Sequence, residues 1–155
     1  MLRIAVLMLA AMLAALPNRP SAAVAETPSL VLMLATDAPA YAPGVPVTFT
    51  VAVDNGGDAP VTVVFPSAQL FDVAVLAEQR EVWRWAADRD FAQAETERIF
   101  PPGLTLLGRV TWDWRYSSGV TLRPGVYQVQ GTLATVPRQP GNVLLVELLG
   151  PQPPA

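Results

Sequence analysis

Residues 47–53, Val47-Thr48-Phe49-Thr50-Val51-Ala52-Val53, decide the fold class of this 155-residue chain. Every second position of this stretch carries a large apolar residue, and Thr or Ala lies between them. Because successive side chains of a β-strand point to opposite faces, the alternation predicts a strand with one buried face. The stretch therefore predicts a sheet that packs on a hydrophobic core.

Further stretches with strand-like composition lie on both sides of this segment. The predicted strands cover residues 30–36, 61–65, 71–76, 81–85, 105–112, 120–122, 126–135 and 143–149. The pair 71–76 and 81–85 has the length of a hairpin. Residues 86–98 lack alternation, and either a short helix capped by Asp88 or an irregular loop fits them. Residues 151–155 are a Pro-rich tail that is predicted to be loose.

Three Pro-Gly pairs stand directly before predicted strands, at Pro43-Gly44, Pro102-Gly103 and Pro124-Gly125. Proline presets the first turn dihedral and glycine accepts positive φ at the second, so each pair predicts a tight turn. Many short strands with such turns predict an all-β fold, an immunoglobulin-like antiparallel β-sandwich of about 7–9 strands. Tyr127 follows the third pair, where it serves either as a tyrosine corner or as a residue that packs on the sheet.

The composition of the chain excludes several classes of enzyme. The chain contains no His, Cys or Lys, and all ten of its basic residues are arginines. It therefore cannot build a Ser-His-Asp triad, a thiolate nucleophile, a Schiff base or an ordinary zinc site. With 52% hydrophobic residues it is apolar enough for a core that needs no metal or disulfide. We expect one domain over residues 26–150 that is not an enzyme and uses no cofactor.

The first 25 residues have the pattern of a secretory signal peptide. Arg3 gives a positive start, residues 4–16 are apolar, and Ala23-Val24-Ala25 is a small-residue cleavage site. An uncleaved anchor is the alternative, although this apolar run is shorter than the about 20 residues that span a bilayer. We therefore expect a protein that is secreted or located in the cell envelope or periplasm. After cleavage of the signal peptide we expect no stable insertion in a membrane.

The charge of the chain bounds its partners. Its formal net charge is −3 at pH 7, and removal of Arg3 and Arg19 with the signal peptide would leave eight arginines against thirteen acids. No stripe of basic residues and no phosphate-binding Gly-rich loop is visible in the sequence. This acidic balance argues against nucleic acid and anionic membranes as partners.

The central part of the chain resembles a known family. Its most specific segments are Phe65-Pro66-Ser67-Ala68-Gln69-Leu70-Phe71-Asp72, Glu81-Val82-Trp83-Arg84-Trp85 and Asp90-Phe91-Ala92-Gln93, in that order. With these segments and the three Pro-Gly pairs, most of the chain is similar to the BsuPI-type intracellular proteinase inhibitor family. The resemblance implies a compact β-sandwich that binds a serine proteinase and has no hydrolytic activity of its own. The predicted export signal departs from a family whose name records an intracellular inhibitor.

Two Trp-x-Trp pairs each enclose a charged residue. Trp83 and Trp85 flank Arg84, and Trp112 and Trp114 flank Asp113. On a strand, the two indoles of a pair share one face and the charge lies on the other. The indoles then form the centre of the core, anchor a partner at the surface together with Arg84, or stack on sugars. Because Arg84 and Asp113 occupy matching places, we also hypothesise an ion pair between them on neighbouring strands.

Two loops are candidate contact surfaces. Pro66 stiffens the loop 66–70, and a preorganised loop loses less entropy on binding. The alternative for this loop is a strand-to-strand crossover in which the Gln69 and Asp72 side chains satisfy backbone groups of the loop. Residues 113–119 place an Arg and a Tyr before small polar residues, which is typical of an adaptable contact surface and also of a solvated hairpin tip. The candidate partner-binding residues are Pro66, Ser67, Ala68, Gln69, Leu70, Trp83, Arg84, Trp85, Arg115 and Tyr116.

The acidic residues Asp88, Asp90, Glu95 and Glu97 lie in a single charged stretch. A solvated loop is the main interpretation, with weak calcium binding or paired acids for glycoside hydrolysis as alternatives. The resemblance to the BsuPI-type family implies a proteinase inhibitor that acts by binding a serine proteinase, and the predicted signal peptide adds that it is exported. The alternative is a cell-envelope or extracellular module that binds polysaccharide or protein without inhibitory activity.

Overall fold

The computed structural model describes residues 30–151, which form ten β-strands and no helix. The strands are β1 (Leu30–Thr36), β2 (Ala40–Tyr41), β3 (Val47–Asn55), β4 (Val61–Phe65), β5 (Phe71–Ala77), β6 (Arg80–Arg84), β7 (Thr96–Phe100), β8 (Gly103–Trp112), β9 (Gly125–Leu133) and β10 (Gln139–Leu148). The predicted all-β fold is confirmed. The described residues hold ten strands where about 7–9 were expected.

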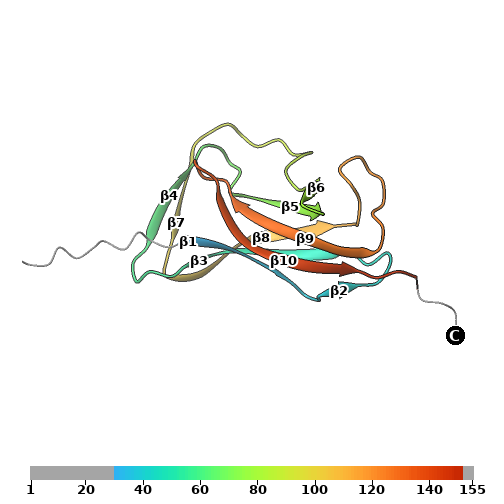
Figure 1. Cartoon of the computed structure of the whole chain (residues 1–155). Coiled ribbons are helices and arrows are strands. Elements are labelled where there is room, and N and C mark those ends of the chain that lie inside the picture. The colour runs from blue at the N-terminus through green and yellow to red at the C-terminus, as the bar shows by residue number, and fades with distance from the viewer. Residues whose placement is uncertain (1–29, 152–155) are drawn as a thin grey trace, which may run out of the picture.

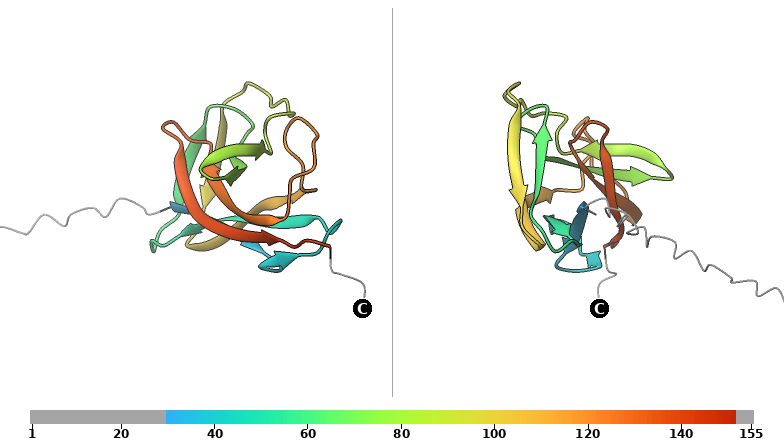
Figure 2. Two further views of the ribbon diagram at one scale, coloured as in Figure 1. Left: turned by 45° about the vertical axis from the view of Figure 1, so that its right-hand side comes forward. Right: turned by 90° about the vertical axis from the view of Figure 1, so that its left-hand side faces the viewer.

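Two sheets pack on each other as a sandwich, and a two-stranded ribbon stands at one end of them (Figure 1). The first sheet has the order β1-β3-β8, the second has the order β2-β10-β9-β5-β6, and the ribbon is β4-β7. Neighbouring strands are antiparallel except for β2, which runs parallel to β10. Two further views show the ribbon upright beside the curved second sheet (Figure 2).

The alternating stretch that begins at Val47 is the central strand of the first sheet. Its four large apolar side chains have no exposed surface (0% each): Val47, Phe49, Val51 and Val53. They belong to one core cluster with side chains from the second sheet, such as Val73 on β5 and Val129 on β9. Burial of each such side chain stabilises the fold by about 1.5–3 kcal/mol. The period-two pattern therefore predicted the buried face correctly.

Strand β1 belongs to the first sheet but crosses close to the second. Asn142 of β10 acts like a strand partner, because its Nδ2 donates to the Leu34 carbonyl at 3.0 Å and its Oδ1 accepts from the Leu34 N–H at 2.6 Å. Two glycines make room for the crossing. A Cβ on Gly131 would lie 2.2 Å from Leu32 Cδ2, and one on Gly141 would lie 2.3 Å from the Leu32 carbonyl oxygen. This side of the sandwich depends on an approach that a Cβ would block.

The first Pro-Gly pair forms the predicted tight turn before β3. The Val45 N–H donates to the Ala42 carbonyl at 3.1 Å, and Gly44 has a φ of 81°. Proline at the second position and a left-handed glycine at the third define a type II turn. The local sequence therefore sets the chain reversal that starts the central strand.

Tyr127 adopts the geometry of a tyrosine corner. Its hydroxyl donates to the Arg123 carbonyl at 2.7 Å, at the start of β9. The ring is buried (7% exposed) and meets Trp112 edge to face at 6.0 Å. Burial, with a smaller effect of Tyr116, raises the pKa of the Tyr127 phenol above its ordinary value. Of the two interpretations, the tyrosine corner is confirmed.

Some of the predicted elements differ from the structure. Residues 120–122 form no strand, and only one isolated bridge joins Arg115 to Thr121. Of the two alternatives for residues 86–98, the irregular loop is confirmed for residues 86–95 and the short helix is not formed, while β7 begins at Thr96. Strands β2 and β7 were not predicted. The predicted hairpin is confirmed as the pair β5 and β6.

The predicted signal peptide, residues 1–25, lies outside the described residues, and so do residues 152–155 of the predicted tail. Within residues 30–151, no helix is long and apolar enough to cross a membrane.

Candidate functional site

The loop 66–70 connects β4 to β5 and is held by its own hydrogen bonds. The Gln69 N–H donates to Ser67 Oγ at 3.2 Å, and Gln69 Nε2 donates to the Phe71 carbonyl at 3.1 Å. The Ala68 N–H donates to the carbonyl of Ala92 at 2.9 Å, which ties the loop to the segment before β7. The Gln69 side chain therefore satisfies a backbone carbonyl at the start of β5, directly after the loop, and the Ala68 N–H ties the middle of the loop to Ala92.

A second loop, residues 134–138, lies beside the first and was not predicted as part of a site. The Ala134 N–H donates to the Leu70 carbonyl at 2.9 Å, and Thr135 Oγ1 donates to the Pro137 carbonyl at 2.8 Å. Val136 at its tip is 81% exposed, the highest value among the exposed large hydrophobic residues described. The only signal in the sequence was an apolar residue before a proline at the end of a strand. We call residues 66–70 and 134–138 together the paired-loop end.

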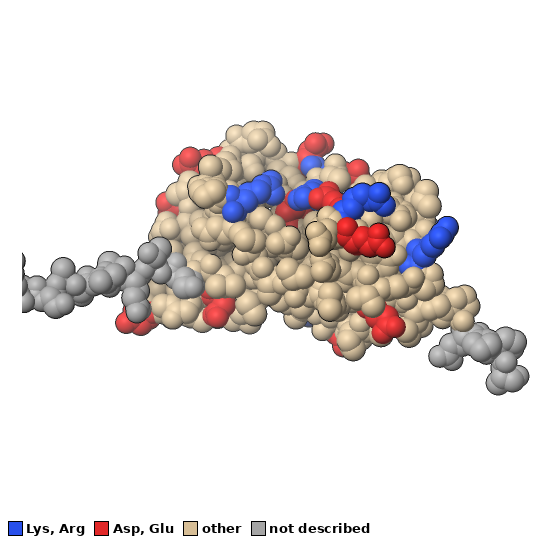
Figure 3. All heavy atoms as spheres, viewed as in Figure 1, with Lys and Arg blue, Asp and Glu red and all other residues tan. Residues whose placement is uncertain are grey.

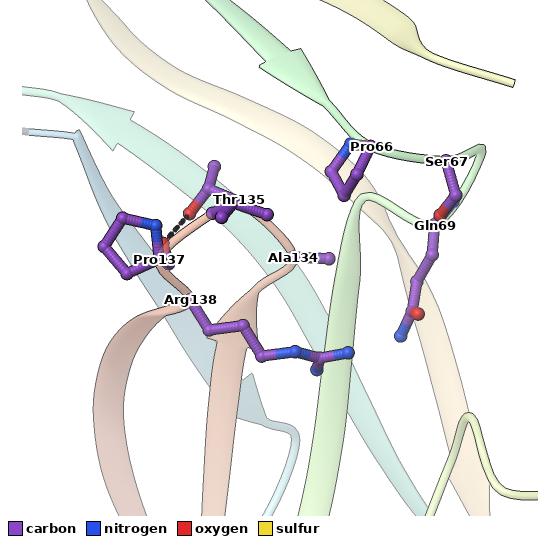
Figure 4. A pocket seen from close by; sticks show the side chains of 8 residues that line it. Pro66, Ser67, Gln69, Ala134, Thr135, Pro137 and Arg138 are labelled. Carbon is purple, nitrogen blue, oxygen red and sulfur yellow. Dashed lines mark hydrogen bonds between the residues drawn. The ribbon is translucent and has the colours of Figure 1, made fainter. Parts of the chain in front are cut away.

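The two loops enclose a shallow pocket of about 330 Å³ (Figure 4). Its lining combines apolar and polar side chains: Pro66, Ser67, Gln69, Ala134, Thr135, Val136, Pro137 and Arg138. In the close view, the Arg138 side chain extends from its loop toward the carboxamide of Gln69. The pocket therefore joins residues that are about 70 positions apart in the sequence.

A buried carboxylate lies behind this pocket. Asp72 on β5 is 2% exposed, and its Oδ1 accepts from the N–H groups of Val73 at 2.9 Å and Ala86 at 3.2 Å. Its Oδ2 lies 2.6 Å from Arg84 Nη1 and 3.6 Å from Arg138 Nη1. Asp72 thus satisfies backbone groups of β5 and of the segment after β6, and not of the loop 66–70 as the crossover interpretation expected. It also links β5 and β6 to the second loop.

Arg84 on β6 is held by two carboxylates. Besides Asp72 it forms a two-pronged ion pair with Glu81. The hydrogen bond to Glu81, followed by the one to Asp72, raises the pKa of the Arg84 guanidinium above its ordinary value. Arginine and acidic side chains stand in a row on the face turned to the viewer in Figure 3. Because each nitrogen of its guanidinium donates to a carboxylate of this chain, Arg84 links Asp72 to Glu81.

Trp85 fixes the segment that follows β6. Its indole stacks on Phe71 with ring centroids 4.6 Å apart and planes at 11°, and it meets Phe91 at 5.7 Å. The guanidinium of Arg89 lies 4.7 Å from the centre of the indole, a cation–π contact. This stack holds the backbone that reaches Ala92, the partner of the loop 66–70.

The four indoles lie in or against the core. Trp112 and Trp114 are buried (1% and 6% exposed), while Trp83 and Trp85 are half-buried and pack against the core. The hypothesis of an ion pair between Arg84 and Asp113 was wrong. Arg84 pairs with Asp72 and Glu81, and Asp113 pairs with Arg115 at 3.2 Å. The reason is that β6 and β8 belong to different sheets.

Arg115 and Tyr116 lie at the other end of the second sheet. Tyr116 lines a hollow with residues of the β5–β6 turn and the start of β9. Strand β5 runs seven residues from the paired-loop end to this turn, which corresponds to roughly 20 Å. The structure therefore groups residues 66–70 with Arg84 and Trp85, while the loop of Arg115 and Tyr116 contacts the middle of β6 through the Ser117 N–H, which donates to the Val82 carbonyl at 3.0 Å.

The four acidic residues of the charged stretch are all exposed: Asp88, Asp90, Glu95 and Glu97. Residues 30–151 contain no group of three or more acidic side chains placed to hold a metal ion. The chemistry that the described side chains offer at the paired-loop end is recognition by shape, hydrogen bonds and charge.

Comparison with protein families places the chain beside known inhibitors. A family model described as BsuPI, intracellular proteinase inhibitor, matches residues 34–138. This finding contradicts the prediction of a secreted or cell-envelope location, since the family is described as intracellular. No curated protein matches the chain.

Several solved structures resemble the chain at low sequence identity. A β-glucosidase from Erythrobacter marinus is 14% identical with a TM-score of 0.45, and the match covers 79% of this chain and 16% of the enzyme. The CARDB domain of a Pyrococcus furiosus protein, solved in complex with di-metal ions, is 15% identical with a TM-score of 0.44 and coverages of 80% and 90%. Pseudomonas fluorescens alkylpurine DNA glycosylase AlkC, bound to DNA, is 13% identical with a TM-score of 0.42 and coverages of 78% and 30%.

Proposed function

Because the chain belongs to the BsuPI family of intracellular proteinase inhibitors, we propose that it inhibits a serine proteinase by binding it with the paired-loop end. The chain acts as an inhibitor and not as an enzyme. The observation that carries this proposal is a pair of adjacent loops that present an exposed apolar tip, Val136, on a hydrogen-bonded frame.

The hydrogen-bonded frame supports binding because loops that are already ordered lose less conformational entropy when a partner binds. An immobilised side chain or loop residue costs about 0.5–1.5 kcal/mol on association, unless it is already ordered. Backbone hydrogen bonds from Ala68 to Ala92 and from Ala134 to Leu70 order both loops before any partner arrives. Val136 then offers apolar area to a pocket of the proteinase at a small entropic cost.

We also propose that the sandwich is of the immunoglobulin-like type. The order β1-β3-β8 corresponds to strands A, B and E of that fold, and the order β10-β9-β5 corresponds to G, F and C. The Tyr127 corner at the start of β9 supports this assignment, because the corresponding strand F carries it in immunoglobulin domains. In this arrangement the paired-loop end combines loops from one end of the sandwich.

The test is a titration of serine proteinase activity with the full chain. Subtilisin-, trypsin- and elastase-type enzymes would be titrated with the wild type, Val136→Asp and Val126→Asp. Val126 is a matched control, because it is also an exposed valine (61%) and it lies on β9 near the opposite end of the sheet.

We expect stoichiometric loss of activity for one enzyme class with the wild type and with Val126→Asp. A carboxylate placed in an apolar contact should weaken inhibition by Val136→Asp by about tenfold or more. Full turnover of all three enzyme classes at tens of micromolar wild-type chain would contradict the proposed function. Equal weakening by both variants would contradict the assignment to the paired-loop end.

A further inference from the structure

Arg138 carries N–H donors that are not fully engaged at the mouth of the pocket between the two loops. Its side chain is 53% exposed, and its contact with Asp72 is long, at 3.6 Å from Nη1 to Oδ2. The same oxygen is already bound by Arg84 at 2.6 Å. Among the described residues, Asp72 is the only carboxylate within 4.0 Å of Arg138. The carboxylate therefore orients Arg138 and leaves most of its guanidinium N–H groups free.

Two further donors face the same space. Gln69 Nε2 uses one N–H for the Phe71 carbonyl, and the second remains. Ser67 Oγ accepts from the Gln69 N–H, so its own proton is free to donate. Figure 4 shows Gln69 and Arg138 reaching toward each other across the pocket.

The other walls are apolar. Pro66, Ala134, Val136 and Pro137 line the pocket together with these donors. A volume of about 330 Å³ is at the lower end of the range of small-molecule sites and suits one or two amino-acid side chains. A planar guanidinium fork matches the geometry of a carboxylate, and apolar walls around it suit the aliphatic part of an amino acid.

We propose that this pocket binds a carboxylate of a peptide chain, with Arg138 as its ion-pair partner and Gln69 and Ser67 as additional donors. The proposal rests on the proposed function in one respect: the carboxylate belongs to the surface of the bound proteinase. An acidic side chain and a C-terminus share this chemistry, and the experiment separates them.

The direct test uses short peptides and ¹⁵N-labelled full chain. The probes are acetyl-Ala-Glu-Ala-amide, acetyl-Ala-Gln-Ala-amide and acetyl-Ala-Ala-Ala with a free C-terminus. We expect saturable shifts of the Arg138 Nε–Hε and Gln69 carboxamide signals with the glutamate peptide, the free-acid peptide or both. The glutamine peptide, which is neutral, should leave both signals in place. Equal shifts with all three peptides, or no shift with any, would overturn the proposal.

Variants supply the matched control. Arg138→Gln should weaken peptide binding by about fivefold or more, since a charge-assisted pair becomes a neutral one. Arg109→Gln changes another exposed arginine, on β8 of the first sheet, and should bind like the wild type. The backbone spectrum of each variant shows whether the fold is kept. Equal weakening by both variants would mean a general effect of charge and would refute the pocket.

Inhibition assays with the same variants separate this proposal from the proposed function. If peptides bind in a way that needs Arg138 but no proteinase is inhibited, the carboxylate pocket is supported and its assignment to a proteinase is refuted. If Arg138→Gln inhibits as well as the wild type and no peptide shifts the signals, the proposed function is supported and the carboxylate pocket is refuted.

Discussion

Replacement of Gly131 by alanine tests the close approach of β1 to the second sheet. An added Cβ would lie 2.2 Å from Leu32 Cδ2 and 2.9 Å from Leu34 Cγ. Both leucines are buried, at 2% and 3% exposed, so they have little room to move. The methyl group therefore forces two core side chains off their positions or pushes β1 away from β9.

The magnitude follows from two opposing effects. Overpacking of a well-packed core costs about 1–3 kcal/mol. Alanine restricts the unfolded chain and returns about 0.4–1 kcal/mol. We expect a net loss of about 1–2 kcal/mol for Gly131→Ala, or a fall in Tm of roughly 3–10 °C for a domain of this size. Gly141→Ala should lose more, because its Cβ would lie 2.3 Å from a backbone oxygen, that of Leu32.

Urea unfolding followed by tryptophan fluorescence measures this loss. The control is Gly108→Ala on β8, where the nearest atom, Phe71 Cζ, lies at an ordinary contact distance of 3.7 Å. We expect a lower midpoint for Gly131→Ala at an unchanged slope, and a midpoint near that of the wild type for Gly108→Ala. Identical midpoints for the two variants would refute the view that the crossing of β1 requires glycine.

Three further predictions concern single polar side chains. Asn142→Ala removes both hydrogen bonds to the Leu34 backbone, so we expect a loss of about 1–3 kcal/mol and faster amide exchange at Leu34, and unchanged exchange would count against it. Asn55 is 1% exposed, and Asn55→Ala leaves two carbonyls and one N–H without their partner. We expect the free energy of unfolding in urea to fall by roughly 2–3 kcal/mol. A fall no larger than that of an exposed substitution would show the reasoning to be wrong. Burial raises the pKa of Tyr127 above its ordinary 10.0, so the stability conferred by its neutral phenol is complete below pH 10 and is lost as the pH rises through the folded-state pKa. The Tm of the wild type should therefore fall more steeply between about pH 9 and pH 11 than that of Tyr127→Phe. Parallel curves for the two proteins would contradict this.

Strands with alternating or continuous apolar residues could be predicted from the sequence because both are local patterns. β1 and β4 were predicted with the bounds that the structure has, and the buried face of β3 was correct. β7 (Thr96–Phe100) was not predicted, because Glu97 and Arg98 stand next to each other and interrupt any apolar alternation, and because its partner β4 lies far away in the sequence. Its strand character comes from that pairing.

The grouping of site residues could be predicted only in part. The loop 66–70 could be proposed as a candidate because Pro66 and the flanking strands are local features. The loop 134–138 joins it through a contact between Ala134 and Leu70, which no local pattern records. The supposed partnership of Arg84 and Asp113 failed for the same reason, because equal places within two similar motifs do not make two strands neighbours.

The contacts that order the paired-loop end converge on the first residues of β5. The stack on Phe71 holds Trp85, the carboxylate of Asp72 holds the Ala86 N–H, and the Leu70 carbonyl holds the second loop. Strand β5 pairs with both β6 and β9, so these groups are fixed by the ladder of the second sheet. Both loops thus lose their conformational entropy during folding, and little more is lost on association. In the proposed function, the proteinase would meet a surface whose shape is set before contact, and inhibition by occupancy of that surface would need no catalytic group from this chain.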